Sequence, residues 1–119
     1  METDFDPKNI TELELKTKCF ENQYNSSNNI DPLLTMYNVP KRYVPIHKCM
    51  HIKLNYMERI PTIGPHRPLW ARYGEYLYLP VQRWLHNIEH GAIVGLYHPC
   101  ADSEQVINYI SSNITAMFN

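Results

Sequence analysis

Residues 79–91, LPVQRWLHNIEHG, lie within the stretch 60–100 around which the rest of the chain is organised. Pro80 suits a first helical turn, where its missing N–H needs no partner, and Gly91 suits a helix end because it adopts a left-handed conformation without steric cost. Four apolar residues recur at the i, i+3, i+4, i+7 spacing of a buried helix face: Val81, Trp84, Leu85 and Ile88. The sequence therefore predicts a helix over residues 80–90.

The other face of this helix carries His86 and His90 one turn apart, with Glu89 at the edge of the same patch. Two imidazoles at i, i+4 can reach one metal ion. Upstream, residues 61–66 (PTIGPH) form a loop stiffened by proline, which can hold His66 in place at low entropic cost.

These residues predict a metal site made by His66, His86 and His90. Glu89 is either a fourth ligand or a partner that orients a histidine. Zinc and copper both accept imidazole, so the donor set does not choose between them. The alternative is structural: backbone carbonyls of the loop bind the helix histidines and thereby lock the loop to the helix.

Several motifs along this region resemble the domain of unknown function 3105 family: Gly64-Pro65-His66, Tyr73-Gly74-Glu75-Tyr76, His86-Asn87-Ile88-Glu89-His90-Gly91 and the closing Tyr97-His98-Pro99. The longer string HRPLWARYGEYLYLPVQRWLHNIEHGAIVGLYHPC is similar to the animal branch of that family, the tumour protein p53-inducible protein 13 group. The resemblance covers residues 43–110. It marks the three histidines and Glu89 as motif positions, whereas the metal assignment rests on their chemistry.

The family pattern usually has a small serine where this chain has Ile63, and it usually continues past Asn119 with a further strand and helix. The chain is therefore a fragment, a short isoform or a divergent member. The resemblance also implies an extracellular or lumenal ectodomain of a membrane-anchored or secreted protein, whose signal and anchor lie outside these residues. A cytoplasmic short form with reduced thiols is the alternative.

Length and charge narrow the function classes. A chain of 119 residues suits one domain. We expect an N-terminal strand and a polar, Pro-rich connector in residues 1–42, and the motif-bearing core in residues 43–119. A net charge of −1 provides no positive electrostatic field to attract nucleic acid. The sequence contains no run of 18 apolar residues, the length that a membrane-spanning helix needs. The partners that we expect are a metal ion and a second protein.

Cysteines and acceptor sequons point outside the cytosol. The three sequons begin at Asn9, Asn25 and Asn113, which suggests a glycoprotein. Three cysteines permit one disulfide. We favour Cys19–Cys49, which leaves Cys100 as a free thiol or as one whose partner lies outside this chain.

Three segments have the alternating pattern or apolar content of strands: residues 11–19, 46–56 and 92–97. Helix remains possible over 11–19, because Glu, Leu and Lys favour it. With helices over 80–90 and 103–117, the fold expected is α+β, a small and mainly antiparallel sheet packed by two helices. On the outward face of 46–56, His47, Cys49 and His51 resemble a soft-metal site, but solvated histidines and a disulfide-bonded cysteine are the commoner outcome.

Three functions follow from these residues. The first is transition-metal binding in an extracytoplasmic domain. The second is a non-catalytic protein-interaction module, which the resemblance implies for a p53-inducible, growth-restraining membrane protein. The third is a metal-dependent hydrolase, because the string from His86 to His90 has the His-x-x-Glu-His form in which Glu89 activates a metal-bound water. Gly91 ends the helix at once and the chain is small for a peptidase, so a non-enzyme is favoured.

Overall fold

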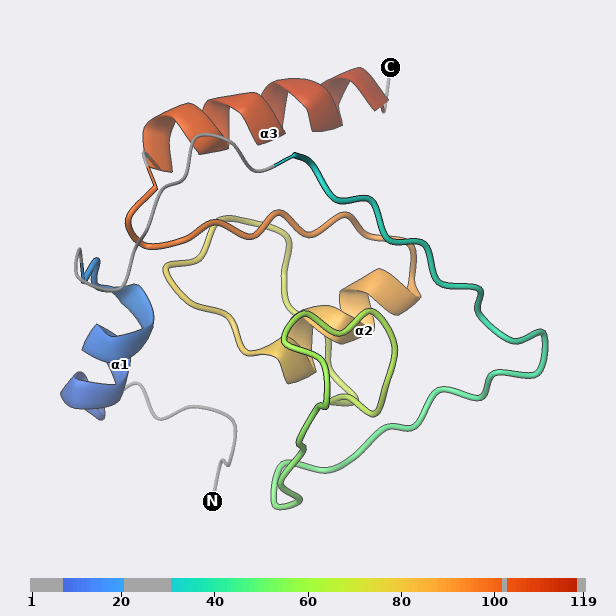
Figure 1. Ribbon diagram of the computed structural model, residues 1–119. Coiled ribbons are helices and arrows are strands. Elements are labelled where there is room, and N and C mark those ends of the chain that lie inside the picture. Colours follow the sequence, from blue (N-terminus) through green and yellow to red (C-terminus); the bar gives the residue numbers. More distant parts are fainter. Residues whose placement is uncertain (1–7, 21–30, 102, 118–119) are drawn as a thin grey trace.

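The computed structural model describes residues 8–20, 31–101 and 103–117, and these contain three helices. Helix α1 spans Ile10–Thr17, α2 spans Val81–Glu89 and α3 spans Ser103–Met117. Figure 1 shows α2 at the centre, with α1 to one side and α3 across the extended segment that follows α2. That segment approaches α3 closely, because a Cβ added to Gly95 would lie 2.6 Å from Ile110 Cδ1.

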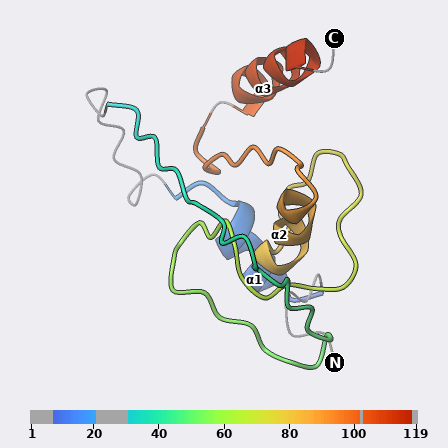
Figure 2. The same ribbon diagram turned by 90° about the vertical axis from the view of Figure 1, so that its right-hand side faces the viewer.

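The described residues contain no β-strand, so the predicted α+β fold with a mainly antiparallel sheet is wrong. Residues 46–56 and 92–97 run as irregular chain, as Figure 2 also shows. Their β-pairing is limited to one parallel bridge between His47 and His66. Lys48 N–H donates to His66 C=O at 2.9 Å, and His66 N–H donates to Ile46 C=O at 3.0 Å. On one side the bridge cannot extend into a ladder, since Pro68 has no N–H to donate to Lys48 C=O, the next acceptor in the series.

Residues 11–19, expected as a strand, lie mostly in α1. Asn9 caps this helix, because its Oδ1 accepts a hydrogen bond from Glu12 N–H at 3.1 Å. No residue of α1 is buried. The alternating apolar residues therefore have no sheet to pack against. The helix propensity of Glu, Leu and Lys, together with the cap, then decides the conformation.

The helix predicted over 80–90 is confirmed as α2. Pro80 is its N-cap, and Gly91 follows its end with φ +83°, a left-handed conformation that suits glycine. The helix predicted over 103–117 is confirmed as α3.

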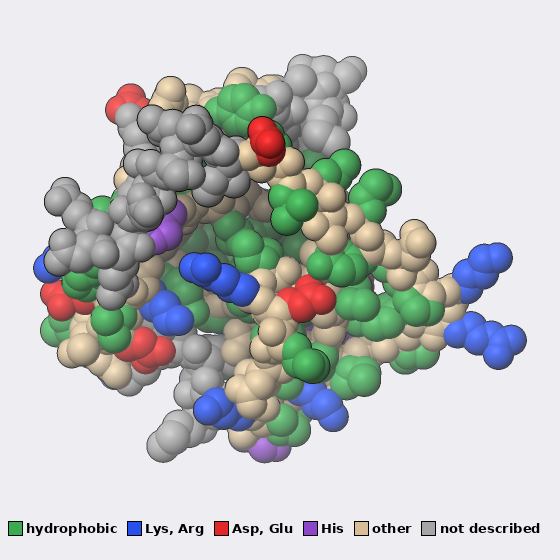
Figure 3. Space-filling view, viewed as in Figure 1, with side chains coloured by type: hydrophobic (Ala, Val, Ile, Leu, Met, Phe, Trp, Pro, Cys, Tyr) green, Lys and Arg blue, Asp and Glu red, His purple; other side chains and the backbone are tan. Residues whose placement is uncertain are grey.

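Apolar burial is confined to the middle of the molecule. Among the described residues, Trp84 and Leu85 are the large apolar side chains that are buried. Four polar residues are buried beside them: His66, Arg67, His86 and Asn87. The other large apolar side chains described are half-buried or exposed, and Figure 3 shows hydrophobic side chains gathered around a hollow on one face. Hydrogen bonds and a cross-link must therefore supply much of what fixes this fold.

The disulfide joins Cys19 to Cys100, so the favoured pairing of Cys19 with Cys49 is wrong. The Cα atoms of Cys19 and Cys100 are 4.6 Å apart, and Cys49 is a free, exposed thiol. The bond connects the end of α1 to the turn before α3. Cysteine spacing does not reveal this proximity, because pairing depends on where the helices lie in space. In the part of the chain that the structure describes, no helix is long and apolar enough to cross a bilayer.

Candidate metal centre

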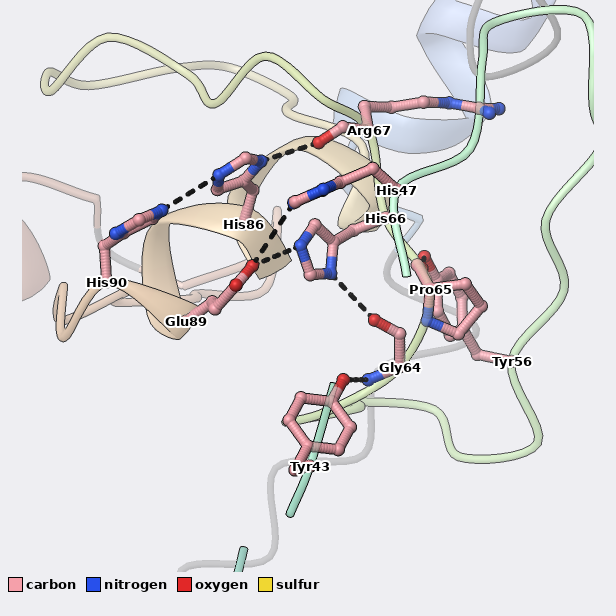
Figure 4. A network of polar contacts seen from close by, with 10 residues as sticks. All are labelled: Tyr43, His47, Tyr56, Gly64, Pro65, His66, Arg67, His86, Glu89 and His90. Carbon is pink, nitrogen blue, oxygen red and sulfur yellow. Dashed lines mark hydrogen bonds and ion pairs between the residues drawn. The ribbon is translucent and has the colours of Figure 1, made fainter. Parts of the chain in front are cut away.

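Three histidines and one glutamate converge beside α2. The four residues are His47, His66, His86 and Glu89, and we call them the His–Glu cluster. Each offers one ligand atom, and these four atoms all lie within 4.8 Å of one another. Figure 4 shows that its members come from three segments: residue 47, the Pro/Gly loop at residue 66, and α2. Three imidazoles and a carboxylate are a donor set that zinc and copper accept.

The parallel bridge described above brings His47 and His66 together. Their rings lie 5.0 Å apart between centroids. The loop carrying His66 is fixed from outside by two tyrosines: Tyr43 Oη accepts from Gly64 N–H at 3.3 Å, and Tyr56 O–H donates to Pro65 C=O. Gly64 has φ +144° and packs against the Tyr56 ring, so a side chain there would be strained.

Backbone carbonyls set the tautomers of the two buried histidines. His66 Nδ1 lies 2.7 Å from Gly64 C=O, and His86 Nδ1 lies 2.7 Å from Arg67 C=O. A carbonyl only accepts, so each Nδ1 carries the hydrogen. Each neutral ring therefore has its lone pair on Nε2. Histidines that bind metals are commonly oriented by such a contact on the other nitrogen.

His66 Nε2 is the one buried side-chain nitrogen or oxygen without a hydrogen-bond partner among the described residues. It contacts Glu89 Oε2, and His47 Nε2 lies 3.7 Å from the same oxygen. The His66 side chain is only 2% exposed. A nitrogen lone pair and a carboxylate oxygen repel each other, so this contact needs a positive charge between them. A second proton on the ring or a bound cation would provide that charge.

His90, predicted as a ligand, lies next to the His–Glu cluster rather than in it. Its Nε2 is 3.0 Å from His86 Nε2, and the two rings are stacked. His47 takes the place that His90 was expected to fill. Neither Cys49 nor His51 belongs to the cluster, so the trio on the supposed strand does not act as one site. The sequence places His47 near two other potential ligands, Cys49 and His51. It does not show that a bridge pairs His47 with His66, which lies 19 positions away.

Arg67 holds the His47 segment against the loop. It is fully buried, and its Nη1 donates to Lys48 C=O at 3.1 Å and to Cys49 C=O at 2.6 Å. Its backbone N–H donates to Gln82 C=O at 2.9 Å, and its C=O receives the His86 contact. One residue thus links all three segments that carry the cluster, as Figure 4 shows in part.

Asn87 fixes α2 to the chain before it. Its amide group pairs with the backbone of Ala71, donating to C=O at 2.9 Å and accepting from N–H at 3.0 Å. Asn87 itself is buried. This pairing replaces the strand contacts that a sheet would supply.

We expect Asn87→Ala to lower the free energy of unfolding by about 2 kcal/mol, because two hydrogen bonds are lost and both Ala71 backbone groups lose their partner. Urea denaturation of the oxidised protein measures the change. The matched control is Asn55→Ala, an exposed asparagine whose replacement should stay within about 0.5 kcal/mol of the wild type. Equal midpoints for the two variants would contradict a structural role for the Asn87–Ala71 pair.

One comparison with known proteins finds a relationship. The family model described as "Protein of unknown function (DUF3105)" matches residues 47–112, more than half of the chain. The match begins at His47 and includes every residue of the His–Glu cluster. No curated protein and no solved structure matches the chain.

Proposed function

We propose that this chain, which belongs to the DUF3105 family of proteins of unknown function, binds one zinc or copper ion through the His–Glu cluster. The observation that carries the proposal is the contact of His66 Nε2 with the Glu89 carboxylate, buried and without a hydrogen bond. A divalent ion bound to both atoms removes their repulsion. The ion also binds the Nε2 lone pairs of His66 and His86. These lone pairs are available because Nδ1 of each ring donates its hydrogen to a backbone carbonyl, of Gly64 and Arg67 respectively.

The size of the cluster suits such an ion. Neighbouring ligands of a tetrahedral ion with bonds of about 2.1 Å are about 3.4 Å apart, and the four ligand atoms here already lie within 4.8 Å of one another. Small side-chain rotations therefore complete the site. His66 and His86 are buried and held by the backbone, whereas the His47 side chain is 42% exposed and free to adjust.

The competing explanation is a second proton on His66, which would make the contact with Glu89 a structural ion pair. A structural ion pair needs His66 and Glu89 only, whereas metal binding also needs His47. His47 and His51 lie in one segment, but only His47 belongs to the His–Glu cluster. Comparing variants at these two positions separates the explanations.

We expect wild-type protein to bind one equivalent of zinc or copper in competition with a chromophoric chelator. His47→Ala should weaken the affinity at least as much as loss of an outer-shell partner does, about 10- to 100-fold, because one of four ligands is lost. His51→Ala should bind as the wild type does. If the folded wild-type protein takes up neither ion, the metal proposal is wrong. Equal affinities of the wild type, His47→Ala and His51→Ala would exclude His47 as a ligand.

The setting proposed is an ectodomain. The Cys19–Cys100 disulfide favours an oxidising compartment. Glycosylation at Asn9, Asn25 and Asn113 belongs to the same proposal. Asn25 lies outside the described residues, the Asn113 side chain is not described, and Asn9 uses its Oδ1 to cap α1.

A second candidate function is a non-catalytic protein-interaction module. The observation favouring it is the exposure of neighbouring apolar side chains, of which Leu33, Leu34 and Met36 are each more than 80% exposed. The hydrolase alternative has less support. Glu89 lies among the ligand atoms, and a carboxylate that binds the ion is not available as a general base.

A further inference from the structure

The neighbouring hydrogen bonds determine which of His86 and His90 is the donor in the contact between them. His86 Nδ1 carries its hydrogen, because it faces the Arg67 carbonyl at 2.7 Å. His86 Nε2 is therefore the acceptor in the 3.0 Å contact with His90 Nε2. It follows that His90 Nε2–H donates to His86.

This hydrogen bond competes with metal binding. A neutral imidazole has one lone pair in the ring plane, so His86 Nε2 serves either His90 or an ion. An ion that takes up this lone pair leaves His90 without its acceptor. His90 can then move its proton to Nδ1 and present its own Nε2 to the ion.

The spacing suits that second role. Two nitrogen ligands with bonds of about 2.1 Å at a right angle are about 3.0 Å apart, which equals the observed separation of the two Nε2 atoms. The two residues stand one turn apart at the end of α2, and their rings are nearly parallel, with an interplanar angle of 17°. The distance is thus right for two neighbouring ligands of one ion.

His90 stands at the exposed end of the row of histidines. Figure 4 shows His86 between it and the histidines of the other two segments. His90 is exposed and His86 is buried. The exposed Trp70 ring contacts both at steep interplanar angles of 68° and 60°, with centroid distances of 5.2 Å to His86 and 5.3 Å to His90. An ion next to His86 therefore meets solvent on the side where His90 lies.

We propose that His90 is an exchange ligand: it donates a hydrogen bond to His86 when no ion is bound, and it becomes a fifth ligand, itself exposed, when one is. This inference rests on the proposed metal binding. It describes a site that takes up and hands over its ion, in contrast to a closed structural site with four fixed ligands.

The test uses cobalt(II), whose visible bands are weak in five-coordinate sites and stronger in four-coordinate ones. We compare the wild type with His90→Phe, which neither donates nor ligates, and His90→Gln, which keeps an N–H donor. His51→Phe is the matched control for an exposed histidine. Both His90 variants should show the stronger four-coordinate spectrum, and His51→Phe should show the wild-type spectrum.

Stopped-flow absorbance gives the second readout. Cobalt uptake should be about two- to tenfold faster in His90→Phe, because one hydrogen bond no longer competes for His86, and close to wild type in His90→Gln. An unchanged spectrum or an unchanged uptake rate in His90→Phe overturns the exchange role. In both cases metal binding by the wild type leaves the proposed function intact, whereas a wild type that binds none of zinc, copper and cobalt removes both.

Discussion

Replacing Cys19 and Cys100 together by serine is expected to lower the free energy of unfolding by about 4.5 kcal/mol, the loop-closure value for a disulfide between residues 81 positions apart. The effect is large relative to the stability of an ordinary domain, about 5–15 kcal/mol. Here the apolar contribution is small, since Trp84 and Leu85 are the large apolar side chains buried in the described residues. The double variant should therefore be close to unfolded at 37 °C.

Urea denaturation of the purified, air-oxidised proteins measures this change. Cys49→Ser is the control, because Cys49 is free and exposed, and its replacement should shift stability by less than about 0.5 kcal/mol. Peptide mapping of the wild type without reduction should recover the Cys19–Cys100 link. A double variant as stable as Cys49→Ser would mean that this bond does not stabilise the protein.

Arg67→Met is expected to affect both stability and metal affinity. We expect a loss of about 3 kcal/mol in the free energy of unfolding, because the charged hydrogen bonds to the Lys48 and Cys49 carbonyls disappear. The same bonds hold the segment that carries His47. Metal affinity should therefore fall by about 10- to 100-fold, the usual range for losing a residue that supports a ligand.

Arg67→Lys is the matched variant for this prediction. It keeps the positive charge, but its single ammonium lacks the planar fork of the guanidinium. Both effects should be intermediate. Calorimetric titration with zinc, together with urea denaturation, separates the two quantities. A destabilised Arg67→Met protein with wild-type affinity would show that His47 reaches the His–Glu cluster without this tie.

The parts of the fold that local signals determine could be predicted from the sequence. Pro80, Gly91 and the apolar spacing between them are enough for α2, because a helix is made of contacts within one segment. The prediction of a sheet rests on alternation and, over residues 92–97, on apolar content. Alternation indicates a strand only where a neighbouring segment pairs with it, and here residues 11–19 form a capped, exposed helix instead.

The candidate site was partly predictable for the same reason. His86 and Glu89 share one helix, and a stiff loop supplies His66, so their chemistry suggested that they meet. His47 joins them through a parallel bridge that no local pattern announces. The disulfide partner of Cys19 was missed for a similar reason, because Cys100 comes near only when α1 and α3 are in place.

The Cys19–Cys100 bond makes residues 19–100 a covalently closed ring, and every member of the His–Glu cluster lies inside it. A protease that cuts this ring once opens it without separating its pieces. The histidines from residues 47, 66 and 86 then remain parts of one molecule, whichever peptide bond was cut. A second cleavage or a reducing agent is needed to separate the pieces, so the cross-link protects the integrity of the site against a first cleavage as well as against unfolding.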